Sequence, residues 1–180
     1  MHKTHMSWII LALAAVFTVS GITGNTQTLL AQNVTNQTIY VGVVVSDLEA
    51  SMDFYENVIG MKNTGNFDVG EDFADISGLS NGVPFHVEVM QLGTKENATE
   101  WKLMEFKGKA KSQKDKYIYG HTGMQYITIN VDNLTPYHER IKEHNVKLMG
   151  ETPVPLGEEN HFILVQDPDG VFIELIGPMK

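Results

Sequence analysis

The sequence of 180 residues contains no cysteine, which excludes disulfide bonds, thiol nucleophiles, thiolate metal ligands and a lipid anchor attached to cysteine. It is also poor in positive charge, with 13 Lys and Arg against 22 Asp and Glu and a net charge of −9. Such an acidic chain is a poor partner for nucleic acid or an anionic membrane surface, and we exclude both. No apolar run reaches the roughly 20 residues that a membrane-spanning helix requires.

The longest apolar run, Trp8 to Val19, follows a short start that carries one lysine and two histidines. A run of this length after a positive start is typical of a signal peptide. Small residues follow it, and we place cleavage after Ala31. We therefore predict an export signal over residues 1–31 and a mature domain over 32–180. The mature protein would be periplasmic or extracellular, without a stable membrane anchor.

The first half of the mature chain predicts one helix among strands. A run rich in β-branched residues at 39–45 predicts a buried strand. Ser46 and Asp47 then cap a helix whose apolar residues recur at helical spacing as far as Ile59. Gly60 is suited to end this helix. Residues 70–82 read as a loop, and three more strands are predicted at 61–69, 84–92 and 101–106.

The second half repeats this order. The pattern predicts a strand at 123–131, a helix that opens at Asn133, a strand that begins at 146–149, and a hairpin over 160–176. Asp167-Pro168-Asp169-Gly170 supplies the hairpin turn, because proline fixes φ, an aspartate bonds the turn backbone and glycine accepts positive φ. Pro153-Val154-Pro155 is expected to break the chain before the hairpin.

The two halves align as an internal duplication. Residues 40–48 match 126–134 at a constant offset of 86 residues. Glu105 and Glu174 then fall in matching places in the last strand of each half, at an offset of 69 residues. A duplicated strand-helix-three-strand unit predicts two modules, at about 39–108 and 123–177.

Alternation of side chains along these strands predicts a cavity between the modules. Three apolar residues in each first strand would pack under the helices: Val41, Val43 and Val45 in one, and Ile127, Ile129 and Val131 in the other. We expect the opposite faces to line the cavity, with Tyr40, Trp101, Leu103 and Glu105 from the first module and Tyr126, Thr128, Phe172 and Glu174 from the second.

This pattern, with Ser46-Asp47-Leu48-Glu49-Ala50-Ser51-Met52-Asp53-Phe54-Tyr55 after the first strand and Asp167-Pro168-Asp169-Gly170 before Ile173-Glu174-Leu175, resembles the vicinal oxygen chelate superfamily. That superfamily holds glyoxalases, extradiol dioxygenases, methylmalonyl-CoA epimerases, fosfomycin-resistance transferases and bleomycin-binding proteins. The resemblance covers 39–177. It implies an α+β fold in which two tandem βαβββ modules form a U-shaped mixed sheet around a central cavity.

The resemblance also implies a set of four metal-ligand positions, one in the first and one in the last strand of each module: Tyr40, Glu105, Tyr126 and Glu174. Many members carry histidine at the first-strand positions. A tyrosine ligates only after losing a proton with a pKa of about 10, which a ferric ion promotes better than zinc, nickel, manganese or magnesium. We therefore expect either a divalent or ferric ion of unknown identity, or no metal if the tyrosines abolish the site.

Two functions follow from the resemblance. In the first, the chain is a glyoxalase-like lyase or isomerase, or a dioxygenase, in which a metal at Glu105 and Glu174 polarises a substrate oxygen and one carboxylate acts as the base. His86 and His161, on neighbouring strands, could replace the missing imidazoles.

In the second, the chain is a metal-free binding or sequestering protein of the bleomycin-resistance type. Tyr40 and Tyr126 would donate hydrogen bonds to Glu105 and Glu174 and leave a polar floor for a small molecule. A third, purely structural interpretation keeps both glutamates in solvent and both tyrosines in the core. The resemblance also suggests a homodimer.

Overall fold

The computed structural model describes residues 38–108, 110–112 and 114–180. The predicted export signal over 1–31 and the predicted lead-in at 32–37 lie outside these ranges. In the part of the chain that the structure describes, no helix is long and apolar enough to cross a bilayer.

The first module has the predicted order of one strand, a helix and three strands, with one helix added. Its elements are β1 (Val41–Val44), α1 (Leu48–Asp53), the π-helical η1 (Phe54–Ile59), β2 (Lys62–Val69), α2 (Glu71–Ile76), β3 (Phe85–Gln91) and β4 (Glu100–Phe106). The side chain of Asp47 accepts the Ala50 N–H and caps α1, as predicted. Gly60 ends η1 with a φ of 83°, a conformation that glycine adopts without strain.

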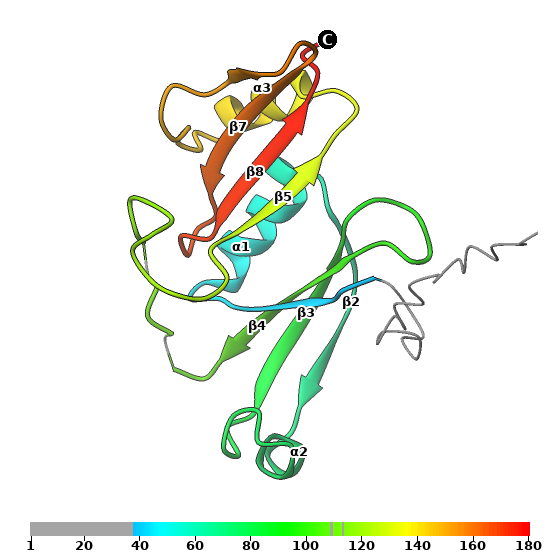
Figure 1. The fold of residues 1–180 in the computed structure, drawn as a ribbon. Coiled ribbons are helices and arrows are strands. Elements are labelled where there is room, and N and C mark those ends of the chain that lie inside the picture. Colours follow the sequence, from blue (N-terminus) through cyan, green and yellow to red (C-terminus); the bar gives the residue numbers. More distant parts are fainter. Residues whose placement is uncertain (1–37, 109, 113) are drawn as a thin grey trace, which may run out of the picture. The chain divides into compact units, whose positions relative to one another are not determined.

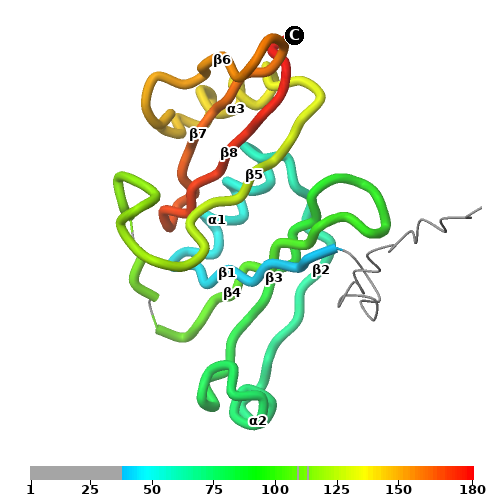
Figure 2. The backbone as a smooth tube through the Cα atoms, viewed as in Figure 1, coloured from blue at the N-terminus to red at the C-terminus, as the bar shows by residue number. Residues whose placement is uncertain are grey.

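The second module repeats the order after a long connection, which Figure 2 traces from β4 to β5. Its elements are β5 (Tyr126–Asn130), α3 (Thr135–Glu143), β6 (Val154–Leu156), β7 (Asn160–Gln166) and β8 (Phe172–Gly177). The expected hairpin is therefore formed by β7 and β8, with the Asp-Pro-Asp-Gly turn between them.

Each module builds its own four-stranded sheet, and the two sheets have the same topology (Figure 1). The strand orders are β1-β4-β3-β2 and β5-β8-β7-β6. In each sheet the first strand is parallel to the last, and the other pairs are antiparallel. The α+β fold with two βαβββ modules is confirmed.

The helix-bearing faces of both sheets share one hydrophobic core. Fully buried residues of η1 and β4 meet those of β7 and β8 in this core, including Ile59, Leu103, Ile163 and Leu175. Val41, Val43 and Ile127 pack against it from the first strands, as predicted. We call the other side of each sheet its open face.

Two local predictions are wrong. The segment 146–149 is not a strand, although the Met149 N–H donates to the Leu164 carbonyl. The strand of this region is β6, within the stretch that was expected to break the chain. Since β6 is the outermost strand and pairs only with β7, Pro155 is tolerated there despite having no N–H.

A third difference lies in 70–82, which was expected to be a loop. This segment contains α2, whose single core residue is Ala74. Only six residues long, α2 lacks the repeated apolar spacing from which a sequence pattern predicts a helix.

Candidate functional site

The strand registers decide which face each predicted site residue occupies. Val41 pairs with Trp101 and Val43 pairs with Leu103, and laterally paired residues point to the same side of a sheet. Trp101 and Leu103 therefore face the helices, where both are buried in the shared core. Trp101, Leu103 and Glu105 were predicted on the opposite face of β4, and that assignment of faces is wrong, although Trp101 still lines a cavity beside β1.

The registers also overturn the predicted equivalence of the two glutamates. Gly42 pairs with Lys102 in the first module, whereas its duplicate Thr128 pairs with Glu174 in the second. The residue that matches Glu174 is thus Lys102. Glu105 lies three residues further along β4, which is about 10 Å away at 3.3 Å per residue and on the opposite face.

On the open face of the first sheet, Lys102 contacts two neighbours. Its ammonium lies 5.0 Å from the centroid of the Tyr40 ring, within cation–π range. It is also 3.7 Å from a carboxylate oxygen of Glu100, which makes an ion pair but is too long for a hydrogen bond. Beside this group, the methyl of Met104 lies over Gly42, so close that a Cβ at Gly42 would be 3.1 Å from it.

On the open face of the second sheet, Tyr126 pairs with Phe172 and Thr128 pairs with Glu174. The Thr128 hydroxyl donates a hydrogen bond of 2.5 Å to Glu174. Glu174 is half-buried, and Tyr126 is exposed. The predicted Tyr126, Thr128 and Glu174 thus share one face, but the partner of Glu174 is threonine, in place of the expected tyrosine.

A cleft lies between β1 and the start of β5. A cavity of about 240 Å³ is lined by all of β1 and by Tyr126, with Trp101 reaching it from the core side. A second cavity of about 230 Å³ adjoins it, shares Val44 and Val171 with it, and reaches Phe172. The inter-module cleft therefore contains three of the predicted ligand-binding residues, which are Trp101, Tyr126 and Phe172.

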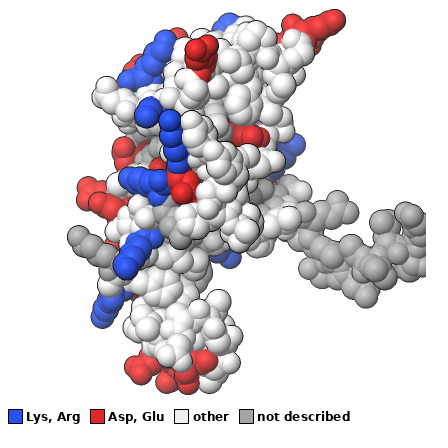
Figure 3. Space-filling view, turned by 60° about the vertical axis from the view of Figure 1, so that its left-hand side comes forward, with Lys and Arg blue, Asp and Glu red and all other residues white. Residues whose placement is uncertain are grey.

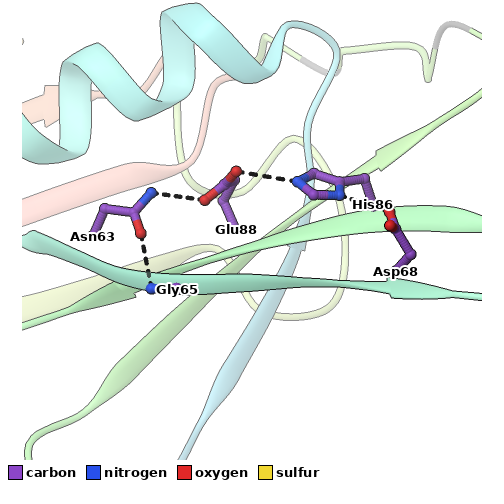
Figure 4. A network of polar contacts seen from close by, with 5 residues as sticks. All are labelled: Asn63, Gly65, Asp68, His86 and Glu88. Carbon is purple, nitrogen blue, oxygen red and sulfur yellow. Dashed lines mark hydrogen bonds and ion pairs between the residues drawn. The ribbon is translucent and has the colours of Figure 1, made fainter.

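Glu105 belongs to a different place. It lines a cavity of about 440 Å³ at the outer end of the first sheet, where His86 is its partner across the β3–β4 ladder. Figure 4 shows His86 between two carboxylates on the helix-bearing side of the sheet. Its Nδ1 lies 2.8 Å from Asp68, and its Nε2 lies 3.1 Å from Glu88.

This network continues to Asn63, whose amide donates to Glu88 at 2.7 Å and whose carbonyl oxygen accepts the Gly65 N–H. The hydrogen bond with Asp68, supported by the one with Glu88, raises the pKa of His86 above its usual value. Both ring nitrogens of His86 therefore contact carboxylates of this network. Its partner on β4, Glu105, lies three positions along the strand from Lys102.

Neither histidine replaces the missing imidazoles on the open faces. His86 lies on the helix-bearing face, as shown above. His161 precedes Phe162, which pairs with Ile176 of the open face, so His161 also points toward the helix side. The four positions that correspond to the family's ligands are therefore Tyr40, Lys102, Tyr126 and Glu174.

This set of donors does not fit a resident metal. One ionised carboxylate, two phenols that must each lose a proton, and an ammonium with no lone pair replace the usual imidazoles and carboxylates. The positive charge of Lys102 would also repel a cation. Over 38–108, 110–112 and 114–180, no three His, Asp or Glu residues are grouped as metal ligands.

The structure reveals a polar link between the modules that the sequence pattern did not predict. The Tyr55 hydroxyl donates to Asp167 at 2.7 Å, and both residues are buried. Asp167 also accepts the N–H groups of Asp169 and Val171 and so closes its own turn. Next to it, the Ser46 N–H and hydroxyl both donate to the Asp169 carboxylate.

Burial shapes the ionisation of this link. Desolvation raises the pKa of Asp167, although the hydrogen bond from Tyr55 acts in the opposite direction. Desolvation, reinforced by the charge of Asp167, raises the pKa of Tyr55 well above its usual value. The two aspartates of the turn thus connect the modules. From the sequence they were expected only to shape the hairpin turn.

Comparisons with known proteins agree with this architecture. The profile of the Glyoxalase/Bleomycin resistance protein/Dioxygenase superfamily matches residues 37–175. A lactoylglutathione lyase of Pseudomonas putida is 26% identical over 168 residues, which cover 89% of this chain and 94% of that protein. A lactoylglutathione lyase of Escherichia coli O157:H7 is 29% identical over 132 residues, covering 73% and 85% respectively.

Among solved structures, a glyoxalase family protein from Bacillus cereus has the same fold, with a TM-score of 0.64 at 20% identity. The similarity covers 81% of this chain and 95% of that one. Since the family profile spans most of the chain and both modules keep the expected topology, the protein belongs to the Glyoxalase/Bleomycin resistance protein/Dioxygenase superfamily.

Proposed function

We propose that the protein binds a small oxygenated molecule at the cleft beside β1 and β5, and that it does so without a resident metal ion. The observation that carries this proposal is the register that puts Lys102 at the place equivalent to Glu174. With the ammonium there, the four family positions hold a cation, one carboxylate, and two phenols that can each donate or accept a hydrogen bond. Such a set suits direct binding of a ligand's oxygen atoms.

A second candidate is a glyoxalase-like lyase or isomerase. The similarity to two proteins named lactoylglutathione lyase favours it. In that case Glu174, which occupies one of the family's ligand positions, is the candidate base, because Glu105 lies on the other side of its sheet. The metal-dependent version with Glu105 and Glu174 as joint ligands is not supported by these registers.

Metal content tests the proposal directly. The mature chain from residue 32, purified without a histidine tag, is offered iron, manganese, nickel and zinc separately, and bound metal is counted per chain. We expect far less than one ion per chain in every case. One ion per chain that disappears in Glu174→Gln would refute the metal-free proposal. Turnover of the methylglyoxal–glutathione adduct would support the lyase.

A gain-of-function variant shows whether the four positions converge. Tyr40→His, Tyr126→His and Lys102→Glu together give two imidazoles and two carboxylates. If these positions face one another across the cleft, the triple variant binds about one zinc or nickel ion per chain. Tyr40→His and Tyr126→His with Lys102 kept is the matched control, and it should bind little metal. Equal, weak binding by both would show that the positions are too far apart.

We also propose that the protein is exported and that residues 1–31 are removed. The supporting observation is the apolar run Trp8 to Val19 after a positive start. Expression of the full chain in a bacterium, followed by cell fractionation and mass determination, tests this. Recovery of the uncleaved chain in the cytoplasm would refute it.

A homodimer is the assembly that we propose, and one exposed surface supports it. Apolar side chains lie open around α2 and the adjoining ends of β2 and β3: Phe67, Phe73, Ile76, Leu79 and Val83. Figure 3 shows a largely uncharged surface at this end, with acidic side chains at its tip. Exposed apolar patches of this kind favour association. Sedimentation of the wild type and of Ile76→Glu should give a dimer and a monomer.

A further inference from the structure

We propose a second binding site, specific for phosphate groups, at a cavity beside the second sheet. Three lysines converge on it, two from the connection between β4 and β5 and one from the segment after α3. The cavity has a volume of about 230 Å³, and its lining residues are Lys114, Asp115, Lys116, Lys147, Met149 and Gln166. The site goes beyond the proposed function, because it contains none of the residues on which that function depends.

The distribution of charge along the chain singles out this region. Residues 107–122 contain five lysines and one aspartate, whereas the whole chain has 13 Lys and Arg against 22 Asp and Glu. A block of like charges repels itself and tends to extend into solvent. Here two lysines of the block instead share a cavity with Lys147 of the second module.

Hydrogen bonds hold both lysine-bearing segments against the same strand, β7. The side-chain amide of Gln166 donates to the Asp115 carbonyl at 2.8 Å and to the Gly170 carbonyl at 3.0 Å. Asp115 lies between the two lysines of the connection, so this bond fixes the backbone that carries them. The Met149 N–H donates to the Leu164 carbonyl at 2.8 Å and fixes the other segment. The cavity is therefore built before any ligand arrives.

The three lysines lack the partners that a purely structural role would provide. Within the described ranges, none of their ammonium groups forms an ion pair with a carboxylate. The carboxylate of Asp115 contacts the His121 imidazole. The Lys116 ammonium lies 5.1 Å from the centroid of the Tyr117 ring, which is neutral. Three like charges around one cavity repel one another, and a bound anion relieves that repulsion.

A phosphate monoester is the ligand class that matches this lining. Three lysines and one aspartate give the lining a net charge of +2. A monoester has a second pKa of about 6, so above neutral pH it carries nearly two negative charges, and its three free oxygens accept hydrogen bonds. Each ammonium has three N–H donors and binds phosphate as a point charge. A carboxylate has one charge and two oxygens, which match fewer of the lysines.

The size of the cavity agrees with a small anionic group. Pockets that enclose a drug-sized ligand have volumes of roughly 300–1,000 Å³. A cavity of about 230 Å³ is smaller than these, so it suits the phosphate group and leaves the rest of an ester outside. The alternative is that the lysines are only solvated at the surface, and binding measurements separate the two roles.

Inorganic phosphate, methyl phosphate and dimethyl phosphate are suitable probes, because they share the tetrahedral centre and differ in charge. Each is titrated into the purified protein at pH 8, in a chloride buffer without phosphate or sulfate, by calorimetry and by amide chemical shifts. We expect one saturable site per chain for the first two, with shifts at 114–116 and 147–149. Dimethyl phosphate, which has one charge, should bind at least about tenfold more weakly, the effect of one hydrogen bond to a charged group.

The two dianions distinguish the source of the phosphate group. Tighter binding of methyl phosphate than of inorganic phosphate would identify phosphate esters as the ligands. The reverse order would identify free phosphate, and either order supports the site.

Variants at exposed lysines test the residues themselves. Lys114→Gln and Lys147→Gln remove a charge from different segments, and each should lower methyl phosphate affinity by roughly 10- to 150-fold. Lys111→Gln is the matched control, because Lys111 belongs to the same lysine block but lines the neighbouring cavity, and it should lose far less affinity. Lys62→Gln, in β2 of the other sheet, should bind as the wild type does. Urea unfolding confirms that each variant is folded.

Equal affinities for the three probes, or dianions that do not saturate a site, would overturn the inference. An equal loss of affinity in all four variants would also overturn it, since binding would then follow net charge in place of this cavity. Neither result bears on the proposed function, which the metal measurement decides separately.

Discussion

Replacement of Tyr55 by phenylalanine should destabilise the protein through one hydrogen bond. The Tyr55 ring is fully buried, packs edge-on against Phe54 at 5.1 Å and lies 5.7 Å from Trp101. Phenylalanine keeps these contacts and removes only the hydroxyl, which donates to Asp167 at 2.7 Å. The change therefore isolates the bond that connects η1 of the first module to the β7–β8 turn of the second.

The size of the effect follows from the ionisation of Asp167. A hydrogen bond to a charged group contributes about 1.5–3 kcal/mol to stability, and one between neutral groups about 1 kcal/mol. Burial raises the pKa of Asp167, so the folded protein holds this proton more tightly than the unfolded chain does. Ionisation of Asp167 thus costs stability as the pH rises from about 3.9 through the raised pKa.

Loss of the Tyr55 donor should raise the pKa of Asp167 further, because that bond favours the ionised form. The destabilisation by Tyr55→Phe is therefore expected to be about 1.5–3 kcal/mol at pH 7 and to fall toward about 1 kcal/mol once Asp167 is protonated. For a domain of this size, the neutral-pH loss corresponds to a decrease in Tm of roughly 3–12 °C.

Urea denaturation of the wild type and the variant, at pH 7 and at successive steps toward pH 4, measures this difference. An unchanged slope against urea would show that both proteins unfold by the same transition. Tyr119→Phe is the control, since Tyr119 is 81% exposed and should leave stability unaffected. A loss below 0.5 kcal/mol at pH 7, or a loss that is the same at every pH, would refute the reasoning.

Three further predictions concern other contacts. The hydrogen bond with Asp68 raises the pKa of His86. The protonated imidazole therefore stabilises the fold fully below about pH 6.5, and this contribution is lost as the pH rises through the raised pKa of the folded state. His86→Gln should lower Tm at pH 6 and leave it nearly unchanged at pH 9. Arg140→Ala should destabilise by about 1–2 kcal/mol in urea unfolding, because Arg140 Nε donates to the Val58 carbonyl across the modules at 3.0 Å. Gly60→Ala should cost about 1 kcal/mol or more by the same measurement, since φ is 83° there.

Much of the fold was predictable because it depends on short, local patterns. The capping Asp47, the terminating Gly60 and the Asp-Pro-Asp-Gly turn all act within a few residues of themselves. The duplication then supplied the second module from the first. The errors lie where tertiary context decides, as at Pro155, which is acceptable only because β6 is an edge strand.

The site was less predictable, because register is a property of two strands. Tyr40 aligns with Tyr126 because residues 40–48 and 126–134 match without a gap from the first strand into the helix. This alignment can be made without knowing which strands pair. In the two modules, loops of different length separate the first strand from the last. The last strands were therefore aligned only by the glutamate that each contains, which matched Glu105 to Glu174. The parallel ladders show that Lys102 is the equivalent residue, and no local pattern carries that information.

The same alternation explains how the chain keeps the family's fold without its ligand set. Along β4, Trp101 and Leu103 belong to the shared core, while Lys102 and Met104 lie on the open face. Packing in the shared core therefore constrains Trp101 and Leu103, and Met104 packs in a second cluster with Phe85, Val87 and Val89, whereas Lys102 belongs to neither cluster. Because profile matches and topology depend mainly on the packed positions and turns, they establish the family. The chemistry depends instead on the family's ligand positions, where an ammonium replaces a carboxylate.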